Sequence, residues 1–377
     1  MAITESVRSD ARSDDEARVL ELCGRLLTER PPGRTSPVEL LGHQFDLGLA
    51  WVHFPEGHGG LGLSPKLQKL INETLAKAGA PRAGGLNPIG HGMGAPTIVT
   101  HGSEAQKQRY LRPLFTNEEI WCQLFSEPGA GSDVAGLSSR AVCDGDEWVV
   151  NGQKVWSSGA HYAHFGILLA RTNLDVPKHR GLTCFACPMD IPGIEPRPLR
   201  QMTGAANFNE VFLTDARIAD EWRIGGVDDG WSVARTLLAN ERMSLSGADG
   251  AFSFEQLADA ARERPDRVDP VVRDRMARLY TQVRTLDFLN ARVMTKLGRG
   301  ETPTAEASVM KLALAAIVTE GATIALGLLG PEGMLGDTPQ SHRLVGSPAM
   351  HIGGGTDEVN KNIVAERVLG LPRDRSR

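Results

Sequence analysis

The feature that most constrains the fold of this chain is a change in the spacing of its apolar residues near residue 120, reversed near residue 230. Before the first change, apolar residues recur at helical spacing, as in 16–27 and 64–79, with Pro and Gly between the helical stretches. Between the two changes they alternate in short runs bounded by turn residues, which is typical of β-strands. Afterwards long helical patterns return. We therefore predict an α+β chain with β structure between two helical parts.

The domain boundaries are expected at these changes. They give an N-terminal helical domain (1–119), a central antiparallel β-barrel or sandwich (120–227) and a C-terminal helical domain (228–377). In the central domain, Asn151-Gly152 lies between two alternating runs and predicts a β-hairpin with a type I′ turn. Further strands are expected at 164–172, 181–189, 193–199 and 209–218.

Composition excludes several classes of protein. A net charge of -5 does not suggest a nucleic-acid binder, which normally concentrates Lys and Arg on one surface. The charged N-terminal segment does not resemble a secretory signal. No apolar run of about 18 residues is evident, so no membrane span is expected. The expected location is the cytoplasm.

The cysteines and histidines do not predict a metal site. The 5 cysteines are too few and too scattered for a disulfide framework. Cys184 and Cys187 form a CxxC pair, but they lie in a predicted strand, where positions three apart point to opposite faces. The 10 histidines contain no HExxH spacing.

A glycine-rich turn closes an extended run in the central domain, where residues 121–128 lead into Gly129-Ala130-Gly131-Ser132. Glycines let the backbone approach a flat or phosphorylated ligand closely, and their N–H groups are available as donors. Alone, such a turn is more often an ordinary surface turn. Here the pattern Asn-Gly-x-Lys-x-Trp-x-Ser follows over 151–158, and the combination is specific.

The combination resembles the signature of the acyl-CoA dehydrogenase family, in which TEPGAGSD is followed by NGxKxWIT. The resemblance continues in the same order along the chain: 51–62 is similar to the family's PEEYGGLG segment, 101–107 to its GTEEQK turn, and 353–373 to its C-terminal signature. It implies the family's fold, with a C-terminal four-helix bundle. It also implies FAD-dependent α,β-desaturation of an acyl-CoA thioester, an oxidoreductase reaction of fatty acid or steroid side-chain metabolism.

The resemblance implies which residues hold the flavin. The family's flavin-contacting strand matches the residues from Gln123 to Ser132, and the positions that cover the isoalloxazine match Trp156 and the two serines after it. An indole can stack on such a ring, and hydroxyl groups can satisfy its acceptors. For Trp156 alone, a core aromatic is the alternative. The implied FAD-binding residues are Gln123, Phe125, Ser126, Gly131, Ser132, Trp156, Ser157, Ser158, Thr356 and Glu358.

The family's reaction needs a carboxylate base beside the α-carbon of the substrate. In many members this Glu stands at the position of Gly354, which has no side chain to act as a base. A second family solution places the Glu on a helix of the C-terminal domain, immediately before an Arg, and Glu241-Arg242 fits it. Apolar neighbours on that helix would bury the Glu241 carboxylate and make it a stronger base. A structural ion pair is the alternative reading of Glu241 and Arg242.

The same resemblance implies the substrate contacts. Ser132 matches a position that touches the CoA arm, and the Gly354 N–H would bond the thioester oxygen as negative charge develops there. The implied substrate-binding residues are Ser132, Arg242, Gly354 and Gly355. Small residues also stand in the helix that usually shapes the acyl pocket, which predicts room for branched, long or bulky acyl groups. These are Gly90, Gly92, Gly94 and Ala95.

Two family features that join subunits are missing. The RxxFG motif, through which a neighbouring subunit holds the FAD pyrophosphate, is not recognisable over 291–299. The neighbour's QxxGGxG is reduced to Gly327, Gly330 and Gly333. Some actinobacterial members resemble this pattern and work as paired, non-identical subunits. We expect a homo-oligomer or an α2β2 heteromer, with an electron-transfer flavoprotein as electron acceptor.

Two other functions suit the same fold. One is a flavin oxidase or monooxygenase of the same superfamily, which would need oxygen access. The other is a non-catalytic subunit that completes a partner's FAD site, a reading that Gly354 favours and Glu241 opposes.

Overall fold

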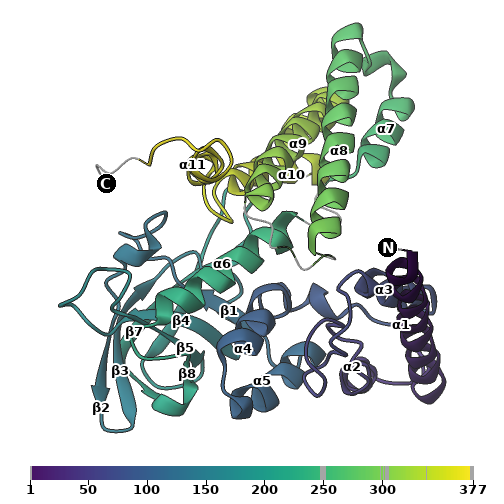
Figure 1. Cartoon of the computed structure of the whole chain (residues 1–377). Helices are drawn as coiled ribbons and strands as arrows, with labels where there is room; N and C mark the ends of the chain where they lie inside the picture. The colour runs from purple at the N-terminus through teal and green to yellow at the C-terminus, as the bar shows by residue number, and fades with distance from the viewer. Residues whose placement is uncertain are drawn as a thin grey trace. The chain divides into compact units, whose positions relative to one another are not determined.

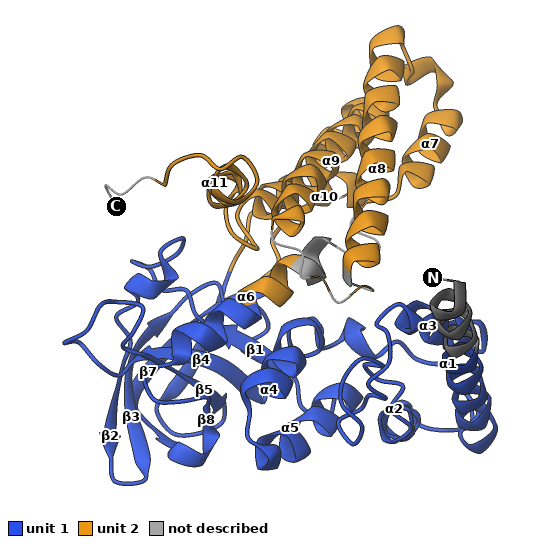
Figure 2. Cartoon of the chain, viewed as in Figure 1, with its two compact units in different colours: residues 1–199, 207–237 blue, residues 200–206, 238–377 orange. Residues whose placement is uncertain are grey.

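The computed structural model describes residues 2–246, 252–297, 299, 301, 305–336 and 338–373. These residues belong to two compact units (Figure 2). Unit 1 comprises residues 1–199 and 207–237, and unit 2 comprises residues 200–206 and 238–377. The segment 247–251, just after the helix of the predicted base, and Gly298, in the stretch 291–299 where the RxxFG motif is not recognisable, lie outside the described residues.

Unit 1 begins with helices, as the helical spacing predicts (Figure 1). They are α1 (Ala2–Glu29), α2 (Pro37–Asp46), α3 (Leu67–Lys77), η1 (Ala83–Gly85), η2 (Gly90–Gly94), α4 (Ala95–His101) and α5 (Glu104–Thr116). Ser36 and Ser103 begin α2 and α5 with complete capping boxes, which satisfy backbone donors that a helix start leaves unpaired. Helices α1 to α3 bury a shared apolar core that includes Leu26, Leu40 and Ile71.

The turn η2 is π-helical, and Asn87 fixes it. The Asn87 side chain is fully buried, and its Oδ1 accepts hydrogen bonds from the N–H groups of Gly90 (3.2 Å) and Trp121 (3.0 Å). A Cβ atom on Gly90 would lie 2.4 Å from this oxygen. Gly94 is buried as well, with Ile167 and Leu114 in ordinary contact range of a Cβ atom there. Packing against Asn87 therefore explains Gly90, whereas Gly94 leaves room for a Cβ atom.

The middle of unit 1 is an eight-stranded sheet with strand order β6-β7-β3-β2-β4-β5-β8, and β1 pairs with β4. Two of the pairings, β1 with β4 and β2 with β4, are parallel, so the sheet is mixed rather than purely antiparallel. Its buried core includes Leu168, Phe185 and Val211. The strands are β1 (Trp121–Leu124), β2 (Arg140–Asp144), β3 (Glu147–Lys154), β4 (Phe165–Arg171), β5 (Leu182–Pro188), β6 (Ile194–Leu199), β7 (Phe208–Ala219) and β8 (Arg223–Ile224), with the 3₁₀ turns η3 (Val134–Gly136) and η4 (Asp220–Trp222) between them.

The predicted hairpin turn at Asn151-Gly152 is wrong. Both residues lie inside β3, which runs unbroken to Lys154, and the hairpin instead joins β2 to β3 around Gly145, whose φ is 69°. A register shift opposite β7 occurs at Gly152. A Cβ atom on Gly152 would lie 2.2 Å from the Ser139 hydroxyl, so this glycine is required by a close approach within the sheet and not by a turn.

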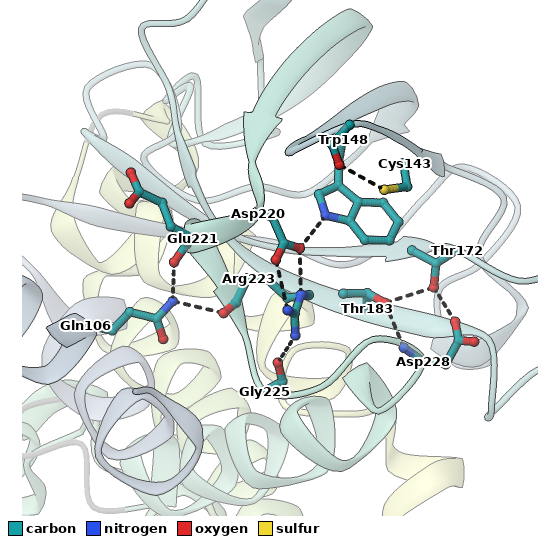
Figure 3. A network of polar contacts seen from close by, with 11 residues as sticks. Gln106, Cys143, Trp148, Thr172, Thr183, Asp220, Glu221, Arg223, Gly225 and Asp228 are labelled. Carbon is teal, nitrogen blue, oxygen red and sulfur yellow. Dashed lines mark hydrogen bonds and ion pairs between the residues drawn. The ribbon is translucent and has the colours of Figure 1, made fainter. Parts of the chain in front are cut away.

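A polar network fixes the segment between β7 and the next helix (Figure 3). The Asp220 carboxylate accepts hydrogen bonds from the Trp148 indole N–H (2.8 Å) and from two nitrogens of Arg223 (2.8 and 3.0 Å). These bonds, chiefly that from Arg223, lower the pKa of Asp220 to about 2. Gln106 of α5 donates to the carbonyls of Glu221 (2.8 Å) and Arg223 (2.9 Å). The network thereby ties α5 to the sheet.

Helix α6 (Gly230–Ser246) starts directly against the sheet. A Cβ atom on Gly230 would lie 2.7 Å from the Thr183 backbone, so only glycine fits there. Asp228, two residues before Gly230, is held against the sheet as well. Thr172 Oγ1 donates to Asp228 Oδ1 (2.6 Å), and the Asp228 N–H donates to Thr183 Oγ1 (3.0 Å). Residues 230–237 of α6 belong to unit 1, and the rest of the helix belongs to unit 2.

Unit 2 is helical, as predicted. Its core lies between α7, α8 and α9 and includes Leu257, Leu279, Ile317 and Ile324. Besides the end of α6 it contains α7 (Phe254–Glu263), η5 (Pro265–Arg267), α8 (Pro270–Leu297), α9 (Glu306–Leu329), η6 (Gly330–Leu335), α10 (Pro339–Gly346), η7 (Ser347–His351) and α11 (Asp357–Arg367).

One helical stretch within the described residues, 306–335, is long and apolar enough to cross a membrane, with a mean hydropathy of 2.0 over 18 residues. The prediction that the chain has no apolar run of about 18 residues is therefore wrong for this stretch. Length and composition are weak evidence here, because a core helix of a globular domain passes the same test. Of that window 39% is buried. Helix α9 buries Lys311 in an ion pair with Asp357 of α11, which is the behaviour of a core helix.

Candidate functional site

The predicted site residues fall into two groups, one in each unit. The group in unit 1 is built from two segments that are adjacent in space although about 20 residues of chain separate them. The Val155 N–H donates to the Ser126 carbonyl (2.8 Å), which places the residues after β1 beside the residues after β3. The structure therefore brings together the two halves of the motif.

Trp156 has the most unusual conformation in this group. Its φ is 60°, in the left-handed region that a bulky side chain rarely adopts, and its side chain is 61% exposed. The indole meets Phe208 edge-on at 6.0 Å. Strained backbone of this kind costs about 1–3 kcal/mol and concentrates at functional sites. An exposed indole held in this way is suited to stacking on a flat ring, and the core alternative for Trp156 is wrong.

Next to it, the Ser157 backbone is clamped by Asn209 of β7, a fully buried residue that sequence reasoning missed. The Ser157 N–H donates to the Asn209 carbonyl (3.0 Å), and the Asn209 side chain donates back to the Ser157 carbonyl (2.9 Å). The Ser157 hydroxyl is buried and has no hydrogen-bond partner within the described part of the chain. An orphaned buried hydroxyl beside an exposed indole is consistent with a polar ring ligand such as a flavin.

The segment from Gln123 to Ser132 can contact a ligand mainly through its backbone rather than its side chains. The Phe125 side chain is 2% exposed, so it reaches a ligand only through its main chain. Gln123 and Ser126 are half-buried, and Gly131 and Ser132 are exposed in the turn after Ala130. The tight turn itself is closed by two hydrogen bonds between the backbones of Glu127 and Ala130. Sequence reasoning also missed the role of Glu127, whose buried carboxylate lies 2.8 Å from Lys154 Nζ.

The group in unit 2 contains the predicted base. Glu241 lies on α6 and is half-buried, and its Oε1 accepts a hydrogen bond from the Gly354 N–H (3.1 Å). These two residues are 113 positions apart in the sequence. Thus the carboxylate and the family's usual base position, empty of a side chain here, are in contact. Burial lowers the pKa of the neighbouring Arg242, and the negative charge of Glu241 partly offsets this.

The loop that carries Gly354 is held firmly. Gly354 and Gly355 have φ values of 69° and 85°, which favour glycine, and the buried Asn360 donates to the carbonyls of Gly355 (2.8 Å) and Thr356 (3.1 Å). The Thr356 hydroxyl caps α11 by accepting from the Val359 N–H, so it is occupied in the fold. Glu358, expected to contact the cofactor, is exposed on the first turn of α11.

A series of polar contacts holds the residues on either side of the Gly354 loop. Asp357 accepts from Lys311 Nζ (2.9 Å) and pairs with His351 Nδ1 (2.7 Å), while His351 Nε2 meets the Thr319 hydroxyl (3.0 Å). Burial tends to raise the pKa of Asp357, but its hydrogen bonds to His351 and Lys311 outweigh burial and lower it. Within the described ranges no group of three or more His, Cys, Asp and Glu residues is arranged to hold a metal ion.

Comparison with known proteins covers nearly the whole chain. Models of the N-terminal, middle and C-terminal domains of acyl-CoA dehydrogenases match residues 29–118, 122–216 and 228–369. The acyl-CoA dehydrogenase IpdE1 of Mycobacterium tuberculosis is 38% identical over 87% of this chain and 86% of its own. The acyl-CoA dehydrogenase FadE34 of the same organism is 40% identical over 87% of this chain, which spans 45% of that longer protein. A solved structure, the Tcur3481–Tcur3483 steroid ACAD, has a TM-score of 0.76 and 26% identity, and covers 97% of this chain and 98% of its own.

Proposed function

The chain belongs to the acyl-CoA dehydrogenase family, and from this we propose that it desaturates an acyl-CoA thioester between the α- and β-carbons with FAD as cofactor and Glu241 as the base. The observation that carries the proposal is the contact between Glu241 and the Gly354 N–H. It supports a carboxylate supplied by α6 at the point where many family members carry their own Glu.

Glu241 would take the α-proton of the substrate. The bond from the Gly354 N–H places its carboxylate, in the chain without substrate, at the position where many family members carry their own base. When substrate binds, the thioester oxygen would take over this N–H as negative charge develops on it, which would free the Glu241 carboxylate to accept the α-proton. FAD, when bound, would supply the acceptor for the β-hydride.

We propose that Trp156 and Ser157 hold the flavin ring, with backbone donors from Ser126 and the Gly131 turn. The exposed indole in a left-handed conformation and the orphaned Ser157 hydroxyl support this. The exposed Ser132 is suited to a contact with the CoA arm. Arg242, half-buried next to Glu241, is suited to hold an anionic part of the substrate or to fix the helix.

The test of the base is Glu241→Gln, which keeps the shape of the side chain and removes its basicity. We expect flavin content to be unchanged and the rate of flavin bleaching by acyl-CoA to fall by at least about 100-fold, the usual share of a general base. Glu263→Gln, an exposed glutamate at the end of α7, is the control and should bleach normally. Unaltered bleaching by Glu241→Gln would show that the base lies elsewhere.

The substrate and the assembly are proposals that rest on the family. A bulky, steroid-type acyl chain is supported by the likeness to a steroid ACAD. An oligomer, either homomeric or α2β2, is supported by the likeness to the Tcur3481–Tcur3483 steroid ACAD and by the reduced interface motifs of this chain. Stoichiometric FAD in the chain purified alone would argue against a required partner, and turnover of short straight-chain acyl-CoAs only would argue against the bulky substrate.

We propose an electron-transfer flavoprotein as the electron acceptor. The competing function, a flavin oxidase of the same fold, predicts that air reoxidises the substrate-reduced protein at once. An acyl-CoA dehydrogenase should instead depend on the flavoprotein or an artificial acceptor. Measuring reoxidation in air-saturated buffer with and without the acceptor separates the two.

A further inference from the structure

An ion pair lies buried beneath the two segments assigned to the flavin. Lys154 Nζ and Glu127 Oε1 are 2.8 Å apart, and the two side chains are 0% and 4% exposed. Burial lowers the pKa of Lys154 to about 8, although Glu127 opposes this. Burial acts to raise the pKa of Glu127, but Lys154 and the surrounding donors outweigh it and hold the pKa at about 2. Both groups are therefore charged at neutral pH.

The pair joins four stretches of backbone. Lys154 Nζ donates to the carbonyls of Phe125 (3.2 Å) and Leu169 (2.7 Å). Glu127 accepts from the N–H groups of Ser138 (2.6 Å) and Ser139 (2.9 Å). Glu127 also accepts a hydrogen bond from the Ser138 hydroxyl. Within the described residues, the other hydrogen bonds of the two charged groups, apart from the ion pair itself, are all made to main-chain groups. This pattern orients backbone around the glycine-rich turn.

Peptide geometry shows what the orientation achieves. In a trans peptide the C=O of one residue and the N–H of the next point in opposite directions. The Phe125 carbonyl points to buried Lys154, so the Ser126 N–H points away from the buried pair. The Ser126 carbonyl is taken by the Val155 N–H, and the Ser126 N–H makes no main-chain hydrogen bond within the ranges described. It is therefore presented as a fixed donor on the side away from Lys154.

Stability alone does not account for such a pair. Replacing a buried ion pair by apolar side chains of similar volume is often neutral or stabilising, because desolvation of the two charges offsets their attraction. The effect of the pair is instead to fix the direction of the main-chain groups that Glu127 and Lys154 bind. We propose that Glu127 and Lys154 are positioning residues that set the Ser126 N–H and the start of the Trp156 segment for the flavin. The proposal rests on the assignment of these segments to FAD.

The experiment uses the purified holoprotein in its own assembly. Glu127→Gln and Lys154→Met each leave one buried charge unpaired, whereas the double variant leaves none and is expected to fold. Folding is checked by far-UV circular dichroism. FAD release on dilution, followed by the fluorescence of free FAD, gives the dissociation constant, and the flavin absorption spectrum reports the environment of the ring. The matched control is Lys69→Met with Glu73→Gln, an exposed ion pair of the same residue types on α3.

We expect the folded double variant to bind FAD at least tenfold more weakly than wild type, with a shifted flavin spectrum, and the control to stay within twofold. A folded double variant with wild-type affinity and spectrum would overturn the positioning role. Trp156→Ala distinguishes this from failure of the flavin site. If Trp156→Ala weakens FAD binding while the double variant does not, only the positioning role is wrong. If neither Trp156→Ala nor the double variant changes FAD binding, both the positioning role and the assignment of these segments to the flavin are wrong.

Discussion

Asn87 offers the sharpest test of how the helical part of unit 1 is joined to its sheet. Its side chain is fully buried and makes four hydrogen bonds, all to main-chain groups. Nδ2 donates to the carbonyls of Leu114 (3.1 Å) and Glu119 (3.0 Å), and Oδ1 accepts from the N–H groups of Gly90 and Trp121. One amide therefore holds α5, the turn η2 and the first residue of β1.

Asn87→Ala would remove Asn87 as the partner of all four groups, but the Leu114 carbonyl keeps its bond from the Asn117 N–H (3.4 Å). A buried polar group left unsatisfied costs about 1–3 kcal/mol, so the other three would give about 3–9 kcal/mol if all stayed dry. Water entering the space left by the amide would recover part of this, because the cavity would be polar. We expect a loss of about 3–5 kcal/mol in the free energy of unfolding, near the upper end for a single substitution.

The assay is urea unfolding followed by tryptophan fluorescence. All 6 tryptophans of the chain, at positions 51, 121, 148, 156, 222 and 231, belong to unit 1, so the signal reports that unit alone. Asn72→Ala, on the exposed face of α3, is the control and should change stability by less than about 0.5 kcal/mol.

Asn87→Asp adds a test with a defined pH dependence. It keeps the volume and the acceptor oxygen but loses both donor N–H groups, and its carboxylate would face the carbonyls of Leu114 and Glu119. Such a carboxyl group would have a raised pKa in the folded state, so the stability of the variant should recover as the pH falls and the group is protonated. If Asn87→Ala lost less than about 1 kcal/mol, or the Asp variant showed no such recovery, the amide would not be the link we describe.

Three further outcomes are expected. Gly152→Ala should destabilise unit 1 by about 1–3 kcal/mol or more, since its Cβ would overlap Ser139. Its urea midpoint should fall below that of Gly24→Ala in α1, where the added Cβ meets open space and the backbone is helical. The hydrogen bonds from Arg223 and Trp148 lower the pKa of Asp220 in the folded chain. Their contribution to the free energy of unfolding is therefore present above about pH 4 and is lost as the pH falls towards about 2. Asp220→Asn should flatten this part of the acid-unfolding curve. Trp156→Ala should weaken FAD retention, and equal or better retention would exclude the stacking role. Trp156→Gly should weaken retention as well, and because glycine adopts a φ of 60° without strain, it should give the flavin-free protein a slightly higher thermal midpoint than the Ala variant.

Much of the candidate site was predictable because its signals are local. The stretch from Gln123 to Ser132 and the motif around Trp156 carry their chemistry within a few residues, and the resemblance of the whole chain follows from such stretches in order. The left-handed backbone of Trp156 and the clamp on Ser157 by Asn209, 52 positions away, carried no such local signal.

The hairpin prediction failed for a related reason. Asn-Gly is a strong turn signal when only neighbours along the chain are considered. In the folded sheet, however, Gly152 is needed because Ser139 from another segment approaches it closely, and Gly145 supplies the turn. A local preference was overridden by a contact that the sequence does not display.

By itself the sequence determined the order of helical and β parts, the family and the identity of Glu241 as the candidate base, because hydrophobic spacing and motifs are properties of consecutive residues. Only the tertiary structure decided that Glu241 meets the Gly354 N–H, 113 positions away, and that Lys154 is buried against Glu127 beside the segments that we propose to hold the flavin. Such pairings depend on distances of about 3 Å between groups far apart in the chain, and these distances are set by packing.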